Sequence, residues 1–95
     1  MKFRIEYNEE KNLLLKGTRG VGFDEVITAI LNDRILDEFE HRDKKNYPNQ
    51  RVFIIKIKNY IYVVPYVKDA ERKVIFLKTV YPSRVLTKKY LGKGE

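Results

Sequence analysis

The sequence contains no cysteine and only one histidine, His41. The absence of cysteine excludes disulfide bonds and thiolate chemistry. A single histidine among scattered acidic residues is too little for a structural zinc site, so we expect no metal and no cofactor. No apolar run has the length and flanks of a membrane helix or a signal peptide. We therefore expect a cytoplasmic protein that does not enter a membrane.

The residues that are present indicate one folded domain. The chain has 95 residues, of which 43% are apolar. This length supports a single hydrophobic core, and the many Ile and Val residues are typical of a globular protein. We therefore treat residues 1–95 as one domain.

The net charge of +7 comes from the second half of the chain. Residues 1–50 contain nine Lys and Arg against ten Asp and Glu, whereas residues 51–95 contain eleven against three. The surplus could simply keep a small protein soluble. It is also typical of a surface that binds a polyanion, nucleic acid above all.

Three apolar runs dominate the second half: Arg51–Ile57, Tyr60–Val67 and Val74–Tyr81. Each run is rich in Val, Ile, Tyr and Phe and is bounded by turn residues, which predicts a strand. Their short connections predict an antiparallel meander. Ile35–Glu40 predicts a further strand, and Lys2–Tyr7 predicts a short edge strand or an extended arm.

Three helices are predicted around these strands. The first runs from about Glu9 to Lys16, with Asn8 as its N-cap. In the second, apolar residues recur at positions 23, 26, 27, 30 and 31 and form one stripe. A short basic helix over Ser83–Leu91 follows Pro82. The sequence therefore predicts an α+β fold, with two N-terminal helices on one face of a four-stranded, mainly antiparallel sheet and a short C-terminal helix.

The glycines at positions 17, 20 and 22 lie between the first two helices. Their spacing fits neither common phosphate-binding loop, and they follow a helix rather than a strand. We interpret them as a tight link, with Gly22 as the N-cap of the second helix and Glu25 in its first turn.

The order of several short motifs resembles the BrnT-type toxins of bacterial type II toxin–antitoxin pairs, within the RelE-like superfamily. NEEKN at 8–12 opens the first helix, RGVGFDEV at 19–26 leads into the second, and an Arg-led strand follows. FLKTVYPSR at 76–84 and the basic TKKYL at 87–91 close the chain. The resemblance covers about Tyr7 to Leu91. It departs from the family at Gly22, where a serine is usual, and in the Tyr-rich strand that Pro65 interrupts.

This resemblance implies a RelE-like fold and an endoribonuclease that inhibits translation. It also implies a cognate antitoxin, often a ribbon-helix-helix protein, and contact with operator DNA only through the toxin–antitoxin complex. Metal-free RNA cleavage proceeds by attack of a 2′-hydroxyl on the adjacent phosphate, assisted by a base, an acid and cations. RelE-like enzymes use Arg, Lys and Tyr for this more than paired histidines.

Two arginines are candidates for binding the scissile phosphate. Arg84 matches the family arginine and would bind the phosphate bidentately, although a surface ion pair with acids of the second helix is the alternative. Arg51 would make a second phosphate contact, or would pair with Glu38 or Glu40 across the sheet.

Two further residues complete the predicted catalytic set. Lys78 lies among apolar neighbours and either reaches the active face or extends to water. His41 titrates near neutrality and is the natural acid or base, unless it is a loop histidine without a role.

Five residues are candidates for contacts with the rest of the RNA. Tyr47, Tyr81 and Tyr90 would stack on unpaired bases, although each could be a core or rim tyrosine instead. Lys88 and Lys89 would follow the phosphate backbone, or form the solvated face of a terminal helix.

Three other interpretations stay open. The chain could be a small nucleic-acid-binding module without catalysis, or a degenerate toxin that acts only through its protein partner. It could also be a domain whose positive charge binds an acidic peptide.

Overall fold

The computed structural model describes residues 3–92, and the predicted strand residue Lys2 lies outside this range. The helices are α1 (Glu9–Arg19), α2 (Phe23–Leu31) and α3 (Arg84–Leu91). The strands are β1 (Arg4–Tyr7), β2 (Ile35–Glu40), β3 (Gln50–Ile57), β4 (Tyr60–Asp69), β5 (Val74–Leu77) and β6 (Tyr81–Pro82). Among the described residues, no helix is long and apolar enough to cross a membrane.

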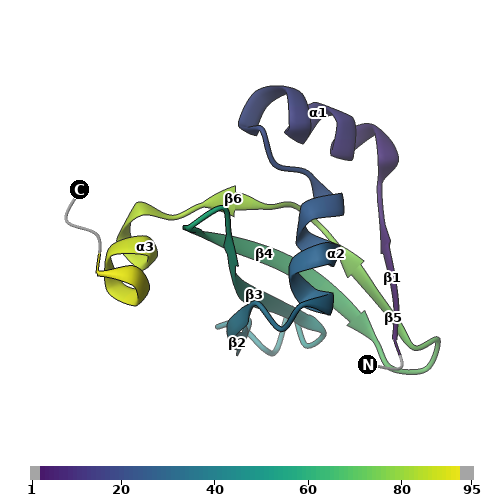
Figure 1. The fold of residues 1–95 in the computed structure, drawn as a ribbon. Coiled ribbons are helices and arrows are strands. Elements are labelled where there is room, and N and C mark those ends of the chain that lie inside the picture. Colours follow the sequence, from purple (N-terminus) through teal and green to yellow (C-terminus); the bar gives the residue numbers. More distant parts are fainter. Residues whose placement is uncertain (1–2, 93–95) are drawn as a thin grey trace.

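The sheet confirms the predicted α+β class but not the strand count. It has six strands rather than four, in the order β1-β5-β4-β3-β2, and β6 pairs with β4 beyond the end of β5 (Figure 1). β3, β4 and β5 form the expected antiparallel meander. β1 adds a parallel edge strand beside β5, so the sheet is mixed. The first segment is therefore part of the sheet and not an extended arm.

The predicted strand over Val74–Tyr81 is interrupted, and Pro65 on β4 gives the physical reason. The backbone N–H of Lys78 donates to the carbonyl of Pro65 at 2.9 Å, but proline has no N–H to return the bond. A ladder cannot continue past a missing donor, and proline inside a sheet marks such interruptions. The chain leaves β4 after Lys78 and pairs again only at Tyr81, opposite Val63.

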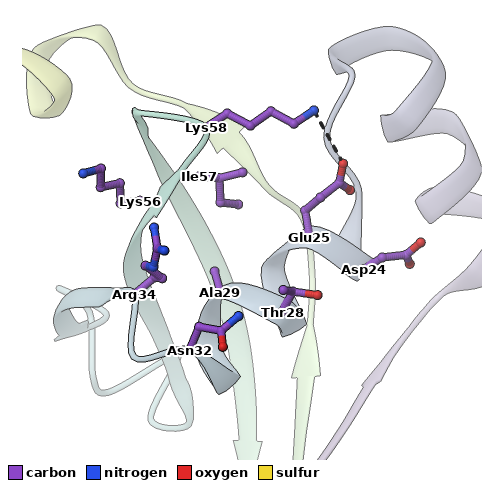
Figure 2. A pocket seen from close by; sticks show the side chains of 9 residues that line it. All are labelled: Asp24, Glu25, Thr28, Ala29, Asn32, Arg34, Lys56, Ile57 and Lys58. Atoms are coloured by element: carbon purple, nitrogen blue, oxygen red, sulfur yellow. Dashed lines mark ion pairs between the residues drawn. The ribbon is translucent and has the colours of Figure 1, made fainter.

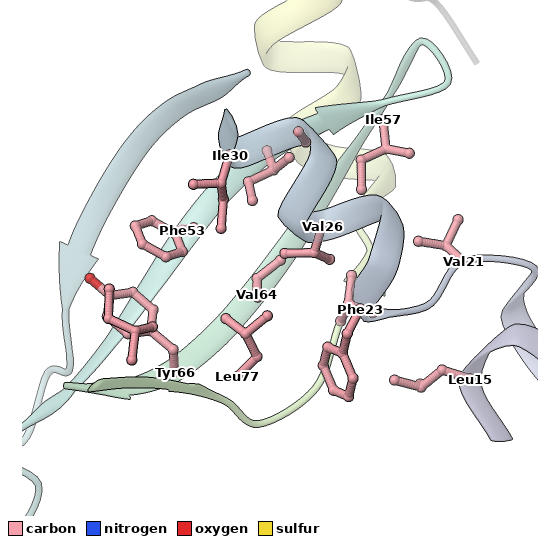
Figure 3. Packing of buried hydrophobic residues seen from close by; sticks show 14 residues of the cluster. Leu15, Val21, Phe23, Val26, Ile30, Phe53, Ile57, Val64, Tyr66 and Leu77 are labelled. Atoms are coloured by element: carbon pink, nitrogen blue, oxygen red, sulfur yellow. The ribbon is translucent and has the colours of Figure 1, made fainter. Parts of the chain in front are cut away.

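Side chains alternate across β3 and β4, and both faces of these strands are covered by helices at different places. On the first face, Phe53, Ile55 and Val64 pack with α1 and α2 residues in the larger core (Figure 3). On the second face, Ile54, Ile61 and Val63 pack against Leu86, Tyr90 and Leu91 at the end of the chain. The two N-terminal helices thus share one face as predicted, whereas α3 lies on the other.

α3 is attached to the sheet through one buried hydroxyl. Thr87 is only 2% exposed, and its Oγ1 accepts the backbone N–H of Ile61 at 2.9 Å while donating to the carbonyl of Ser83 at 2.7 Å. Ser83 caps the helix by accepting the N–H of Leu86 at 3.1 Å. These bonds fix where α3 crosses the second face, because an unpaired buried donor on β4 would be costly.

The first helix is longer than the sequence predicted. It continues through Gly17 and ends at Gly20, whose φ of +73° is the left-handed conformation that favours glycine. Arg19, in the last turn, donates from Nη1 to the carbonyl of Val80 at 2.5 Å and so ties the helix to the segment between β5 and β6. Only Leu15 of the three consecutive leucines is buried, whereas Leu13 and Leu14 are each 63% exposed.

Asn12 holds the junction between α1 and α2. Its side chain is 2% exposed, donates to Asp24 at 3.1 Å and accepts the backbone N–H of Phe23 at 2.7 Å. Glu25 accepts the N–H of Gly22 at 2.9 Å, as the sequence suggested for the first turn of α2. The hydrogen bonds from Lys16 and Asn12 lower the pKa of the Asp24 carboxyl.

Gly22 is required at this junction for space. A Cβ at this position would lie 2.4 Å from Asn12 Oδ1 and 2.8 Å from Lys16 Cγ. We expect Gly22→Ala to lower the free energy of unfolding by about 1–3 kcal/mol, the usual cost of overpacking. Gly17→Ala is the matched control, because nothing lies within 4 Å of its added Cβ, and it should stabilise the helix by about 0.5–1 kcal/mol. Urea unfolding measures both, and equal midpoints for Gly22→Ala and the parent would contradict the close contact.

Candidate nucleic-acid interface

The part of the second sheet face that α3 leaves uncovered is called the open face below. The strand register aligns the side chains of this face in rows across the sheet. The central row contains Phe39, Val52, Pro65 and Lys78. The row on one side of it contains His41, Gln50, Val67 and Phe76, and the row on the other side contains Val63 and Tyr81. Rows of this kind arise because alternate residues of a strand point to the same face.

A groove of about 620 Å³ runs along this face beside α3. Its apolar floor comes from Val52, Ile54 and Val63, and Leu86 of α3 forms one wall. Phe39, Glu40, His41, Arg42 and Tyr81 line the remainder. The groove therefore combines apolar and aromatic surface with a small number of polar groups, which is typical of ligand sites.

His41 lies where β2 leaves the sheet, and its ring orientation is defined. The backbone N–H of Asp43 donates to His41 Nδ1 at 3.0 Å, so in the neutral ring the proton is on Nε2. The ring of Tyr47 lies against it, with 4.5 Å between ring centroids. Asp43 also accepts the side-chain amide of Asn46 at 2.8 Å, and this bond lowers the pKa of the Asp43 carboxyl. The loop that follows β2 is thus organised around the histidine.

Lys78 and Tyr81 reach the open face from the interrupted strand. Lys78 is exposed and aligned with Pro65 by its backbone bond, which puts its position on the open face. Its exposure fits both predicted orientations of the side chain. Tyr81 is 40% exposed and lies opposite Val63 in the groove. The gap between β5 and β6 therefore puts two predicted site residues near one another on the same face.

Three predicted basic residues lie on α3. Arg84 is the first residue of the helix and is exposed, directly after the N-cap Ser83. Lys88 and Lys89 are exposed in its last turns. No ion pair joins Arg84 to an acid among residues 3–92, so the alternative that the sequence offered for this arginine is not formed there.

Tyr90 has a packing role. Its hydroxyl donates to Asp37 Oδ2 at 3.1 Å, and its ring packs in the small core between α3 and the sheet. Burial and the Asp37 hydrogen bond raise the pKa of the Tyr90 hydroxyl. The rim-tyrosine alternative therefore describes Tyr90 best, and its ring is less accessible for stacking than that of Tyr81.

Arg51 does not join the open face. It points to the first face of the sheet, the one that α1 and α2 cover. There its Nε lies 2.9 Å from Glu38 and its Nη1 lies 3.3 Å from Glu40. Nε also donates to the Tyr66 hydroxyl at 3.1 Å, and that hydroxyl donates to Glu38. The hydrogen bond with Glu38 raises the pKa of Arg51, and burial raises the pKa of Tyr66 well above its usual range. The cross-sheet ion pair considered from the sequence is formed, so the structure does not bring Arg51 together with His41, Lys78 and Arg84.

This network predicts that Arg51 acts on stability. Arg51→Ala leaves Glu38 and the Tyr66 hydroxyl without their shared donor, and we expect a loss of about 1–2 kcal/mol in the free energy of unfolding. Arg34→Ala, at an exposed arginine without an ion pair in the described part of the chain, should change it by less than about 0.5 kcal/mol. Thermal unfolding gives the comparison, and an Arg51→Ala protein as stable as the parent would contradict a structural role.

A second hollow, of about 310 Å³, lies between α2 and the turn joining β3 to β4 (Figure 2). Basic side chains of Arg34, Lys56 and Lys58 face acidic Asp24 and Glu25 across it. Lys58 Nζ is 3.9 Å from Glu25 Oε2, a weak and exposed pairing. None of the predicted site residues lines this hollow, and its charges largely offset one another.

Sequence reasoning missed Phe39, Phe76 and Arg42 as residues of the open face. Phe39 is separated from His41 by one residue, so strand alternation alone could have put both on one face. Phe76 shows its position only once its register with Val67 is known.

Comparisons of the chain with protein families, with characterised proteins and with solved structures found no match.

Proposed function

We propose that the protein is an endoribonuclease of the BrnT-like toxin class that cleaves RNA on the open face. The observation that supports this most is that His41, Lys78 and Tyr81 all lie on the open face of the sheet, and that α3 beside this face begins with Arg84. The basic excess of the second half of the chain favours a polyanionic substrate.

In the proposed reaction the 2′-hydroxyl oxygen attacks the adjacent phosphorus, and the bond from phosphorus to the 5′-oxygen breaks. Water takes the proton of the attacking 2′-hydroxyl and returns one to the leaving 5′-oxygen. The Nε2–H of His41, which faces away from the Asp43 contact, is assigned to donate a hydrogen bond to that leaving oxygen. Arg84 is assigned to the oxygens of the reactive phosphate, where negative charge increases in the transition state. Lys78 is assigned to a neighbouring phosphate of the strand, because the register separates it from His41 by three strand spacings. The products are a 2′,3′-cyclic phosphate and a 5′-hydroxyl, and no metal or cofactor is needed.

The proposal includes a cognate antitoxin, of the ribbon-helix-helix type common in such pairs, and a cytoplasmic site of action on translation. Operator DNA would be bound only by the toxin–antitoxin complex. These parts rest on the sequence resemblance alone.

A non-catalytic RNA-binding module is the second candidate. It is favoured by the separation of Arg51 from the other predicted catalytic residues and by the presence of a single histidine. Purified protein incubated with RNA distinguishes the two, because a binding module retards the RNA in a gel without shortening it.

Arg84→Ala is expected to reduce the cleavage rate about 100-fold or more, the scale seen when one preorganised donor to a developing charge is removed. Arg84→Lys should restore only part of the rate, because a lysine cannot reproduce bidentate contact with phosphate. Single-turnover cleavage of a labelled RNA measures the rates, and analysis of product ends tests for the cyclic phosphate. Arg34→Ala serves as the exposed-arginine control, because Arg34 lines the hollow beside α2 and not the groove of the open face. A rate for Arg84→Ala equal to that control would remove Arg84 from the site.

Replacing Lys88 and Lys89 together by alanine should weaken RNA binding most at low salt. Each lost phosphate contact reduces the slope of log K against log salt by roughly 0.7–0.9, so the pair should flatten it by about 1 to 2 units. Fluorescence anisotropy across a salt series measures the slope. Lys11→Ala, at an exposed lysine of α1, is the control that should leave it unchanged.

A further inference from the structure

Two aromatic side chains of the open face have no role in the proposed chemistry. Phe39 on β2 is 47% exposed, and Phe76 on β5 is 37% exposed. Phe39 lines the groove beside α3, and Phe76 lines another hollow of about 390 Å³ on the same face, together with Val67 and Lys78. Single exposed apolar residues are ordinary on protein surfaces. These two are unusual because they flank the same set of polar groups.

The register places each ring beside one polar group, with Phe39 next to His41 on β2 and Phe76 next to Lys78 at the end of β5. Phe39 begins the row that ends at Lys78, and Phe76 ends the row that begins at His41. Three strand spacings and two residues along the strand separate them, roughly 16 Å in a flat sheet. A single base cannot span that separation, so a ligand in contact with both rings must be an extended chain.

We propose that Phe39 and Phe76 are stacking platforms that hold two unpaired bases of an RNA strand, one on each side of the reactive phosphate. The inference rests on the proposed function and specifies its substrate as single-stranded RNA. Aromatic side chains accept any base through its π-face, and a duplex hides these faces within its own stack. The platforms would therefore select unpaired RNA without strong preference for sequence.

The charges around the two rings favour RNA over an apolar protein partner. Arg42, Arg72 and Lys78 line the two hollows and form no ion pair within residues 3–92. Three acidic residues also line them. Glu40 is paired with Arg51 and Lys44, Glu6 is paired with Arg4, and Asp69 accepts the backbone N–H of Arg72. Free cations beside exposed aromatic rings suit a chain that carries both phosphates and bases.

The test uses a short, fluorescently labelled single strand with 2′-O-methyl groups, which binds without being cleaved. We expect Phe39→Ala and Phe76→Ala each to weaken binding about tenfold, within the range for loss of one stacked base, with an unchanged salt slope. Phe39→Trp should bind within about twofold of the parent, whereas Phe39→Leu should be nearly as weak as the alanine variant, because leucine lacks a π-face. Leu31→Ala is the control, since Leu31 is a 75% exposed apolar residue on α2.

Thermal unfolding of each variant verifies that the domain is folded. If the parent binds RNA and both alanine variants keep its affinity, Phe39 and Phe76 are not stacking platforms, while the proposed function stands. If Phe39→Leu binds the RNA as tightly as the parent, the contact does not need a π-face and the stacking assignment is overturned. If the parent neither binds nor cleaves RNA, the proposed function fails as well.

Discussion

Strand β4 is the element on which the rest of the structure depends. Its alternate residues are buried on both faces, with Val64 and Tyr66 in the larger core and Ile61 and Val63 in the smaller one. It pairs along its length with β3 and, in succession, with β5 and β6. A strand that is covered on both faces has a nearly continuous run of apolar residues in its sequence. The burial of this apolar surface is the main favourable term in folding. The helices on both sides are positioned by this one strand.

The first face, which α1 and α2 cover, and the open face differ in whether their polar groups have hydrogen-bond or ion-pair partners. Asn12, buried at the junction of α1 and α2, bonds to Asp24 and to the N–H of Phe23, as buried polar groups must. On the first face, Arg51 pairs with Glu38 and donates to the Tyr66 hydroxyl. On the second, Lys78 forms no ion pair in the described range, and the His41 ring presents Nε2 away from its backbone partner. Polar groups that are held in position but not paired are the ones available to a ligand.

The interruption caused by Pro65 connects the fold with the proposed site. A continuous strand from Val74 to Tyr81 would have followed β4 closely, with its N–H and carbonyl groups all paired. Instead the chain departs from β4 after Lys78 and rejoins it at Tyr81, and α3 begins three residues later at Arg84. Pro65 on β4 is thus the residue that shapes the candidate interface.

The sequence by itself determined the α+β class, the meander, the apolar stripe of α2 as far as Ile30 and the short helix at the end of the chain, because these follow from local periodicity and turn residues. The start of that helix was not determined, since Pro82 belongs to β6 and Ser83 is the N-cap. The parallel pairing of β1 with β5, the division of the last strand and the side of the sheet that α3 covers were decided by tertiary structure. They depend on contacts between residues distant in the chain, which local patterns do not encode. The same holds for the site: alternation could relate Phe39 to His41 within one strand, but only register across the sheet relates His41 to Phe76, or separates Arg51 from both.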